Sequence, residues 1–402
     1  MLLDRRDSGP TLVVAPVSVG FNWQRETERF APTLRPILYR ETDRVEFLKT
    51  LGPGDMLITS YYLMQQHAEE LSAVKWGTLV LDEAQYIKNS QTKTAQVVRG
   101  LDADWRLALT GTPCENHLGN LWSVFRGVSP GLFGSWERFR EVFADPIEKG
   151  KVSERKQPLS RVLRPFVLRR TKSEVLKELP ARTEVQLTAE LSDPERRRYE
   201  DARLWAVTHL TGLETDTGKD QRFQVLAALT KLRQFACHPR LVDQTWDKSS
   251  AKLDLFLETV DELREGKHRA LVFSQFTSHL ALIREALDER KIAYQYLDGQ
   301  TTPKQRQVRV DAFQHGDGEF FVISLKAGGT GLNLTGADYV IHLDPWWNPA
   351  VEDQATDRAH RIGQTRPVTV YRLVAKDTIE EQILKLHGDK RNLVAGVLDG
   401  TD

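Results

Sequence analysis

Two adjacent carboxylates, Asp82 and Glu83, directly follow a short apolar segment at residues 78–81. Four apolar or β-branched residues without alternation predict a buried parallel strand. In open α/β sheets, ligands bind just beyond the carboxyl ends of the strands, where these two acids would lie. An aspartate there can hold Mg²⁺ against nucleotide phosphates, and a neighbouring glutamate can orient or deprotonate an attacking water. An ordinary strand that runs into an acidic turn would have the same residues.

A second group of side chains that could bind phosphate lies nearer the C-terminus. Gln354, Arg358 and Arg361 are spaced four and then three residues apart, which predicts one shared face of a helix. We expect this helix to begin near Glu352 and to end at Gly363. The planar guanidinium group of arginine matches the oxygens of a phosphate. Two arginines on one helix face are also common on solvated surfaces.

A glycine-rich run, KAGGTG at residues 326–331, follows another predicted strand. Glycine lets the backbone approach a phosphate closely, and it also allows an ordinary turn. The run by itself favours the turn, so its interpretation depends on the rest of the chain.

The composition is that of an ordinary globular protein, with 402 residues, 40% hydrophobic and 28% charged. No apolar run approaches the roughly 20 residues that span a bilayer. Cys114 and Cys237 cannot build a disulfide framework or a zinc cluster, and we expect reduced, packed thiols in a cytoplasmic protein. Basic and acidic residues number 56 each. Net charge therefore gives no sign of a polyanionic partner, and any basic surface must be local.

Strands alternate with helices in two parts of the chain, which predicts two parallel sheets covered on both faces. The expected strands are residues 11–15, 55–61, 78–81 and 105–109 in the first part, and 270–273, 294–297, 320–324, 339–343 and 368–374 in the second. Helical periodicity dominates between them, and Ser192 and Thr302 begin two clear helix-start signals. The fold class is thus α/β, with two lobes and a helical insertion.

We expect four segments along the chain: a first lobe at residues 1–117, helical protrusions at 118–242, a polar linker at 243–252 and a second lobe at 253–402. The two lobes repeat in architecture only, and the sequence has no short-period repeat.

Several runs carry a family resemblance: LVLDEAQYIKN, LALTGTPCENHLGNLWSVF, LRPFVLRRTK, LVFSQF, SLKAGGTGLNLTGADYVIHLDPWWNP and DQATDRAHRIGQTRPVTVYRLVAKDTIEEQI. In these runs and in their order, the chain resembles the Swi/Snf family of DNA translocases, within the second helicase superfamily. The resemblance extends over about residues 11–383. It implies two RecA-like lobes and an ATP-driven motor on double-stranded DNA.

The resemblance also implies roles for individual residues. Asp82 would bind Mg²⁺ together with ATP, and Glu83 would position the hydrolytic water. Arg358 and Arg361 would act as arginine fingers, with Gln354 beside them. Residues implied to line the nucleotide cleft, or to couple it to DNA, are Thr110, Gly111, Thr112, Gly329 and Gly331.

For DNA, the resemblance implies contacts to the phosphate backbone, because a translocase that ignores sequence has no need of base-edge readers. The candidates are Ser18, Thr59, Ser60, Ser324, Lys326, Trp347, Arg169, Arg170 and Lys172. Ser18 would equally suit a helix cap. The basic cluster formed by Arg164, Arg169, Arg170 and Lys172 would equally suit salt bridges between the lobes. Trp346 and Trp347 favour packing within the second lobe over base stacking.

The family's phosphate-binding loop, Gly-x-Gly-Lys-Thr, has no match in the 402 residues. The strand that feeds this loop and the segment that contacts adenine are missing as well. We therefore expect an incomplete first sheet with open backbone hydrogen bonds, a less stable first lobe and little ATP hydrolysis by this chain alone. An N-terminal segment that carries the loop would be a required partner.

Three interpretations stay open: the core of a double-stranded DNA translocase that remodels a DNA-bound protein complex, a non-catalytic DNA-binding remnant, and an RNA helicase. The long helical insertion and the LRPFVLRRTK run disfavour the RNA helicase.

Overall fold

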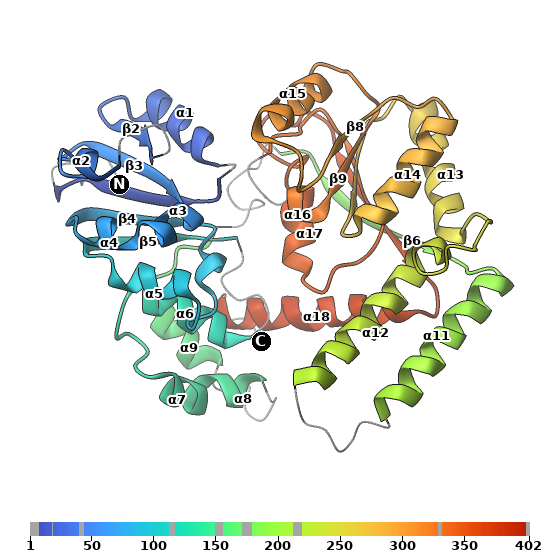
Figure 1. Ribbon diagram of the computed structural model, residues 1–402, viewed down its shortest axis with the longest axis horizontal. Helices are drawn as coiled ribbons and strands as arrows, with labels where there is room; N and C mark the ends of the chain where they lie inside the picture. The colour runs from blue at the N-terminus through green and yellow to red at the C-terminus, as the bar shows by residue number, and fades with distance from the viewer. Residues whose placement is uncertain are drawn as a thin grey trace. The chain divides into compact units, whose positions relative to one another are not determined.

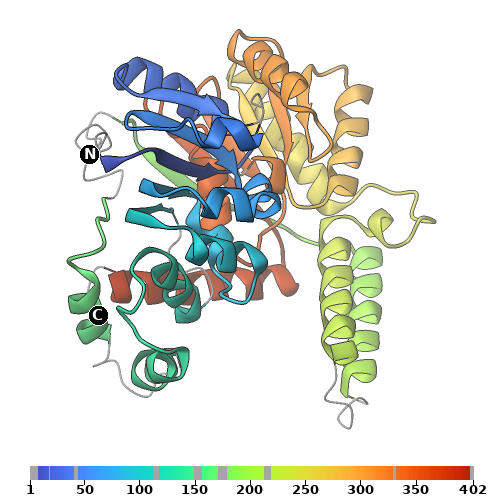
Figure 2. The same cartoon turned by 60° about the vertical axis from the view of Figure 1, so that its left-hand side comes forward.

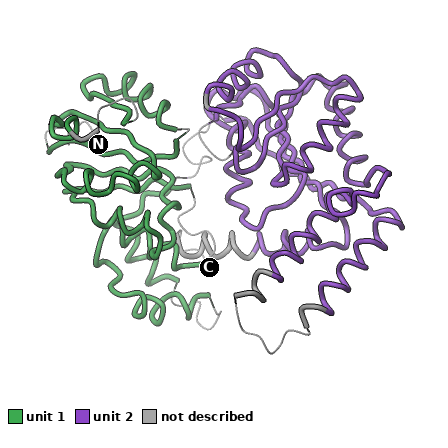
Figure 3. Tube along the Cα trace, viewed as in Figure 1, with its two compact units in different colours: residues 1–169, 390–402 green, residues 170–389 purple. Residues whose placement is uncertain are grey.

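The computed structural model of the chain describes residues 8–17, 19–39, 44–111, 117–148, 156–170, 179–211, 219–328 and 332–398. It divides into two compact units (Figure 3). Unit 1 comprises residues 1–169 with 390–402, and unit 2 comprises residues 170–389. Each unit is built on one parallel sheet with helices on both faces (Figure 1). This arrangement confirms the predicted fold class of two α/β lobes.

The sheet of unit 1 has the order β2-β3-β1-β4-β5, and all of its neighbouring strands are parallel. The central strands are buried except at Asp82, the last residue of β4, which is why they appear in the sequence as continuous apolar runs. The edge strands are only partly buried. The bounds are β1 Thr11–Ala15, β2 Arg35–Leu38, β3 Asp55–Ser60, β4 Trp76–Asp82 and β5 Ala103–Leu109.

Alternate residues of these strands pack on opposite faces. Leu12 and Val14 of β1 contribute to a core with α3 (Tyr61–Gln66), α4 (Ala68–Ser72) and α5 (Lys93–Gly100). Val13 and Ala15 face the opposite side, where α1 (Gly20–Phe30) packs. A short helix, α2 (Arg44–Leu48), precedes β3.

The described strands of the first sheet leave no internal gap. β4 pairs directly with β5 from Trp76↔Ala103 to Asp82↔Leu109, so the described sheet is continuous. Backbone groups of a buried strand require hydrogen-bond partners, and β5 supplies them to β4. Backbone hydrogen-bonding groups are left open at the outer side of β5, as expected for an incomplete sheet, and at the other edge strand, β2; both strands are only partly buried.

A separate, largely aromatic cluster lies below the sheet of unit 1, where Phe139 is buried among Trp122, Phe133 and Trp136. It is formed by α6 (Leu118–Val128), α7 (Trp136–Phe139), a π-helical turn (Arg140–Ala144), α8 (Asp145–Glu148) and α9 (Lys156–Leu163).

The sheet of unit 2 has the order β6-β11-β10-β7-β9-β8 and is also parallel throughout. The bounds are β6 Arg182–Ala189, β7 Ala270–Ser274, β8 Tyr294–Leu297, β9 Phe320–Ser324, β10 Tyr339–His342 and β11 Val368–Ala375. The five later strands confirm the sequence predictions to within a residue or two. β6 falls in the region predicted to be mainly helical; it is a largely exposed edge strand paired with β11 along its whole length.

Helices cover both faces of this sheet. One face packs against α13 (Ala251–Glu265) and α14 (Thr277–Glu289), and the other against α15 (Pro303–Gln314), α16 (Leu325–Gly328) and α17 (Pro349–Thr356). α18 (Ile379–Leu398) follows β11.

The helical region of the sequence contributes to both units, so the compact units partition the chain differently from the four predicted segments. Its later part forms a hairpin in unit 2, in which α11 (Asp193–Thr211) and α12 (Lys219–Cys237) lie side by side (Figure 2). The predicted start signals are confirmed: Glu195 accepts from the amide of Ser192, and Thr302 forms a complete capping box with Gln305.

None of the helices in the described part of the chain combines the length and apolar character that crossing a membrane requires.

Candidate active site

Asp82 and Glu83 lie at the carboxyl end of β4, as predicted from the sequence. Asp82 is the last residue of the strand. Glu83 has φ 52° and ψ 53°, in the left-handed region that residues with a Cβ rarely adopt. This conformation turns the chain into a 3₁₀ helix, Ala84–Ile87. Such strained residues concentrate at functional sites, where the surrounding structure holds them in place.

Three hydrogen bonds fix Asp82. The indole Nε1 of Trp23, on α1, donates to Oδ2 at 2.8 Å, and the amide of Glu83 donates to Oδ1 at 2.9 Å. The hydroxyl of Tyr61, at the start of α3, donates to the Asp82 carbonyl at 2.8 Å. Helices from both faces of the sheet thus converge on one residue.

Tyr61 is held in its protonated, donating form. Burial raises the pKa of its hydroxyl well above 10, and the nearby carboxylates Asp82 and Glu83 raise it further. Its ring stacks on that of Tyr86, with centroids 4.8 Å apart. Burial, followed by the charge of Glu83, also raises the pKa of Tyr86.

Gln85 joins the strand-end acids to the segment after β5. Its side-chain amide Nε2 donates to Glu83 Oε2 at 2.6 Å, and its Oε1 accepts from the Thr110 hydroxyl at 2.9 Å. A movement of either Glu83 or Thr110 would therefore disturb the hydrogen bond between Gln85 and the other residue.

These acids line a cleft of about 1210 Å³ within unit 1. Thr110 and Gly111 line the same cleft, together with β5 and the segment around Phe166. The structure thus brings together, in one cavity, four of the residues predicted for nucleotide binding and chemistry.

The donor set at the strand end fits a magnesium ion. Mg²⁺ is usually bound through one or two carboxylates and the phosphates of its substrate, with water in the remaining positions. Asp82 offers a half-buried carboxylate at the cleft, oriented by Trp23 and by the backbone. Each of its oxygens keeps a further lone pair, because each accepts one of these bonds.

The predicted arginine-bearing helix in unit 2 is only partly correct. α17 begins at Pro349 and ends at Thr356, so Gln354 is helical while Arg358 and Arg361 lie in the turns that follow. Leu334 donates to the Arg358 carbonyl, and Gln364 donates to the Ala359 carbonyl. The amides of Arg358 and Ala359 instead donate to carbonyls three residues earlier, as in a turn. Gly363 has φ 99°, in the left-handed region that favours glycine.

Arg358 and Arg361 differ in exposure. The Arg358 side chain is buried, at 7% exposure for the residue, whereas Arg361 is exposed. Gln354 is half-buried. The three residues remain neighbours along one short segment of unit 2.

Several predicted DNA contacts lie at strand ends. Thr59 and Ser60 end β3 beside β1, at the same edge of the sheet as Asp82, and both are buried. The Ser60 hydroxyl caps α3 by accepting from the Leu63 amide at 3.1 Å. In unit 2, Ser324 is buried at the end of β9 and the following Lys326 is exposed.

The basic residues Arg164, Arg169 and Arg170 are exposed. Five further candidates lie outside the described residues: Ser18, Thr112, Lys172, Gly329 and Gly331.

Arg233, on α12, was not anticipated from the sequence as a site residue. It is 4% exposed and its guanidinium lies 5.2 Å from the Trp346 ring centroid and 5.3 Å from that of Trp347. It also donates to the Pro345 carbonyl at 2.8 Å. This contact supports the packing interpretation of the two tryptophans.

Trp23 and Gln85 were likewise not anticipated as site residues. Trp23 appears in the sequence only as one apolar residue of an amphipathic helix, although an indole near a polar strand end often has a hydrogen-bond partner. Gln85 is the last residue of the DEAQ run, two positions after Glu83, and this proximity could have indicated a role in the site.

Both halves of the chain are similar to known protein families. Residues 2–241 match the family model of the SNF2-related domain, and residues 251–363 match that of the helicase conserved C-terminal domain. The putative ATP-dependent helicase/translocase YwqA of Bacillus subtilis is 39% identical over 399 residues, which cover 96% of this chain and 43% of that protein. The human SWI/SNF-related matrix-associated actin-dependent regulator of chromatin subfamily A member 1 is 35% identical, with 95% of this chain and 38% of that protein covered.

Among solved structures, the Sulfolobus solfataricus SWI2/SNF2 ATPase core in complex with dsDNA is 35% identical. It has a TM-score of 0.48 and covers 99% of this chain and 84% of that chain. The chain spans less than half the length of the two curated relatives named above. Because the SNF2-related model alone accounts for more than half of its residues, the chain belongs to the SNF2-related family.

Proposed function

We propose that this chain is the core of an ATP-dependent translocase that moves along double-stranded DNA. The observation that carries the proposal is the hydrogen-bonded connection from Glu83 through Gln85 to Thr110 at the mouth of one cleft. It links Glu83, which would position the attacking water, to the segment after β5. Loss of the γ-phosphate of ATP could then change the conformation of that segment. The family and the printed name of the Bacillus relative support the same activity.

Each residue of the network has a distinct role in this proposal. Asp82 would hold Mg²⁺, which when bound supplies charge neutralisation for the phosphates of ATP. Glu83 orients the attacking water and accepts its proton, and Gln85 holds the carboxylate in position. Thr110, Gly111 and Thr112 pass the nucleotide state on towards DNA.

In unit 2, we assign Arg358 and Arg361 to the negative charge that develops on the phosphates, with Gln354 beside them. The exposure of Arg361 supports its role as a residue that reaches a ligand. Gly329 and Gly331 would let the backbone approach the same nucleotide.

The proposed partner is double-stranded DNA, held at its phosphates by the strand-end residues, by Lys326 and by the exposed arginines Arg169 and Arg170, together with Lys172. Ser18 and Trp347 are further candidates from the sequence. A DNA-bound protein complex would be the object that is remodelled. The site of action would be the nucleoid of a bacterium or the nucleus of a eukaryote.

Hydrolysis also needs a lysine that reaches the β- and γ-phosphates, and no Gly-x-Gly-Lys-Thr loop occurs in the 402 residues. We therefore expect the purified chain to hydrolyse ATP poorly, with or without DNA. Robust DNA-stimulated hydrolysis by these 402 residues would contradict this.

The decisive experiment uses a longer protein that carries such a loop ahead of Met1. Its ATP hydrolysis is compared in the presence of duplex DNA, single-stranded DNA and RNA, with Glu83→Gln as the inactive reference. Stimulation chiefly by duplex DNA supports the translocase. DNA binding without hydrolysis would identify a non-catalytic remnant, and stimulation chiefly by RNA would identify an RNA helicase.

Arg361→Ala in the longer protein tests the role of unit 2. We expect duplex DNA binding to stay within about twofold while hydrolysis slows by roughly 10³-fold, the effect of losing an arginine finger. Arg366→Ala, another exposed arginine five residues away, is the matched control. Unchanged turnover in Arg361→Ala would remove this residue from the mechanism.

A further inference from the structure

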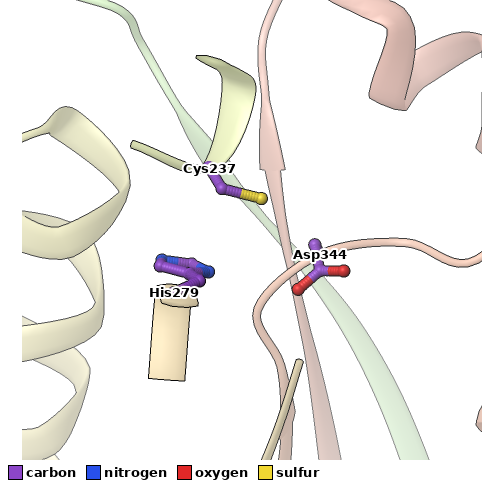
Figure 4. Close-up of side chains that lie close together, drawn as sticks. All are labelled: Cys237, His279 and Asp344. Atoms are coloured by element: carbon purple, nitrogen blue, oxygen red, sulfur yellow. The ribbon is translucent and has the colours of Figure 1, made fainter. Parts of the chain in front are cut away.

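Three side chains with metal-binding atoms converge in the interior of unit 2. Cys237 ends α12, His279 lies in the first turn of α14, and Asp344 follows β10 (Figure 4). Their donor atoms, Sγ, a ring nitrogen and a carboxylate oxygen, all lie within 4.8 Å of one another. The residues are 0%, 1% and 3% exposed.

His279 makes this cluster unusual. In the described part of the chain, neither of its ring nitrogens has a hydrogen-bond partner, although both are buried. Buried polar groups are nearly always paired, because an unpaired one loses its hydration without compensation. The imidazole nevertheless faces a thiol and a carboxylate (Figure 4). A bound cation is the ligand that such a ring nitrogen, with its lone pair, can accept.

The three donors match zinc chemistry. Zn²⁺ binds cysteine sulfur, histidine nitrogen and carboxylate oxygen in a tetrahedral arrangement, often with three protein ligands and a fourth small one. From the usual bond lengths, the donors of such an ion lie roughly 3.5 Å apart. Binding would require the donors, now within 4.8 Å of one another, to draw closer together. A thiolate and a carboxylate supply two negative charges to the ion, and Glu380 adds a third beside the buried cations Lys252 and Arg233.

The carboxylate is already oriented by neighbours. The Ser274 hydroxyl donates to Asp344 Oδ1, and the amide of Gln275 lies 3.4 Å from Oδ2 as a further donor. Supporting bonds of this kind fix a metal ligand in position. Arg233 is 3.9 Å from the same carboxylate, and its charge is shared with the aromatic rings and with the Pro345 carbonyl.

We propose that Cys237, His279 and Asp344 bind one Zn²⁺ ion, with a small ligand such as water in the fourth position. Cys237 belongs to the part that matches the SNF2-related domain, whereas His279 and Asp344 belong to the helicase C-terminal part. The ion would fasten the α11–α12 hairpin to the sheet of unit 2. This site is independent of the proposed ATP chemistry.

The test begins with the metal content of the untagged 402-residue chain after growth in zinc-supplemented medium. Because the ligands are buried, we expect the ion to be captured as the chain folds. The chain is therefore also unfolded with a chelator and refolded with Zn²⁺ or with Co²⁺, whose visible absorption reports tetrahedral thiolate coordination. We expect one equivalent of metal per chain, a cobalt–thiolate band and a higher unfolding temperature with zinc.

Two ligand variants, Cys237→Ala and His279→Leu, are compared with Cys114→Ser, which removes the other cysteine. We expect at least a 100-fold loss of zinc affinity in both ligand variants and none in the control. Ser274→Ala should weaken affinity by about 10-fold, as is typical when a supporting hydrogen bond to a ligand is lost.

The result on the unaltered chain decides the proposal if a ligand variant fails to fold. Absence of a cobalt–thiolate band after refolding would overturn it. Zinc binding that is equal in the unaltered chain and in folded His279→Leu would also overturn it, as would binding that disappears only in Cys114→Ser.

Discussion

Gln85 uses both ends of its side-chain amide, and this makes it the residue on which the proposed site depends. Its NH₂ group holds Glu83, and its oxygen holds Thr110. Trp23 and Tyr61 fix Asp82 in a similar way from two different helices. The acids are therefore positioned by uncharged donors, which leaves their negative charge available for a metal ion and water.

Gln85→Ala should uncouple Glu83 from Thr110. In the longer protein with a phosphate loop, we expect DNA-stimulated hydrolysis to fall by roughly 10-fold or more, because a hydrogen bond to a charged group is worth about 1.5–3 kcal/mol. ATP affinity should change little. The measurement is steady-state hydrolysis with and without duplex DNA. Gln91→Ala, at an exposed position of the same segment, serves as the control and should behave as the unaltered protein.

Glu352 gives a pH-dependent prediction. Burial raises the pKa of this carboxyl to about 7, although Arg372 at 3.0 Å and the Trp346 amide at 2.7 Å favour its charged form. The folded state thus keeps a proton that the unfolded state releases near pH 4.5. The contribution of Glu352 to stability is fully present below that pH and is lost as pH rises through 7.

Glu352→Gln removes this titration. Between pH 4.5 and 7.5 we expect the free energy of unfolding of the unaltered chain to fall relative to the variant, by up to about 3 kcal/mol. Urea unfolding of unit 2, followed by tryptophan fluorescence at several pH values, measures the difference. Glu289→Gln, an exposed substitution on α14, should follow the unaltered profile. A difference that does not vary with pH would contradict the prediction.

At the scale of elements, α13 and α18 are joined by a fully buried ion pair. Lys252 Nζ lies 2.6 Å and 2.5 Å from the two carboxylate oxygens of Glu380, and neither side chain is more than 1% exposed. Glu380 also accepts from the amide of Ala375, the last residue of β11. The pair therefore orients two helices and a strand together.

Lys252→Met leaves the Glu380 carboxylate buried without its partner. We expect a loss of about 3–5 kcal/mol in the stability of unit 2, because an unpaired buried charge is strongly unfavourable. Lys252→Met/Glu380→Gln should recover most of the loss. The matched control is Arg264→Met, which breaks the exposed Arg264–Glu319 pair and should change stability by about 1 kcal/mol or less. Chemical unfolding of the four proteins decides between these outcomes.

The elements also show what a sequence can predict. Buried strands such as β1 and β9 are continuous apolar runs, so their positions follow directly from the residues. β6 is mostly exposed, and an edge strand without an apolar run gives no such signal. The helix predicted to carry Arg358 and Arg361 ends at Thr356, because the spacing of side chains does not show where the backbone leaves helical geometry.

The candidate site was likewise predictable only where it depends on local sequence. Asp82 and Glu83 could be placed at a strand end from local sequence, because a strand-end position depends only on neighbouring residues. Trp23 is 59 residues from its partner Asp82, and Thr110 is 25 residues from its partner Gln85. Only the tertiary fold places these residues in contact. The cysteine count excluded a zinc cluster of cysteines alone, but it could not address donors contributed by three distant segments.

At the scale of the whole molecule, the two units share one plan, a parallel sheet between two layers of helices, but differ in how well the sheet is enclosed. Both sheets have partly exposed edge strands, but one face of the unit 1 sheet is covered mainly by α1. The sheet of unit 2 is covered by at least two helices on each face.

We therefore expect unit 1 to open more readily than unit 2. In native-state hydrogen exchange, amides of β1, β3 and β4 should exchange faster than those of β7, β9 and β10, and β5 should be the least protected strand of its sheet. Mass-spectrometric exchange on the purified chain measures this. Equal protection of the two sheets would contradict it.

The left-handed backbone at Glu83 has an evolutionary consequence. Glycine adopts this conformation without steric penalty, so Glu83→Gly would relieve the turn and at the same time delete the carboxylate. Selection for stability alone would thus favour glycine at this position, whereas the role proposed for Glu83 in turnover would account for keeping the acid. The presence of glutamate in this turn is what a working catalyst, rather than a merely durable fold, would preserve.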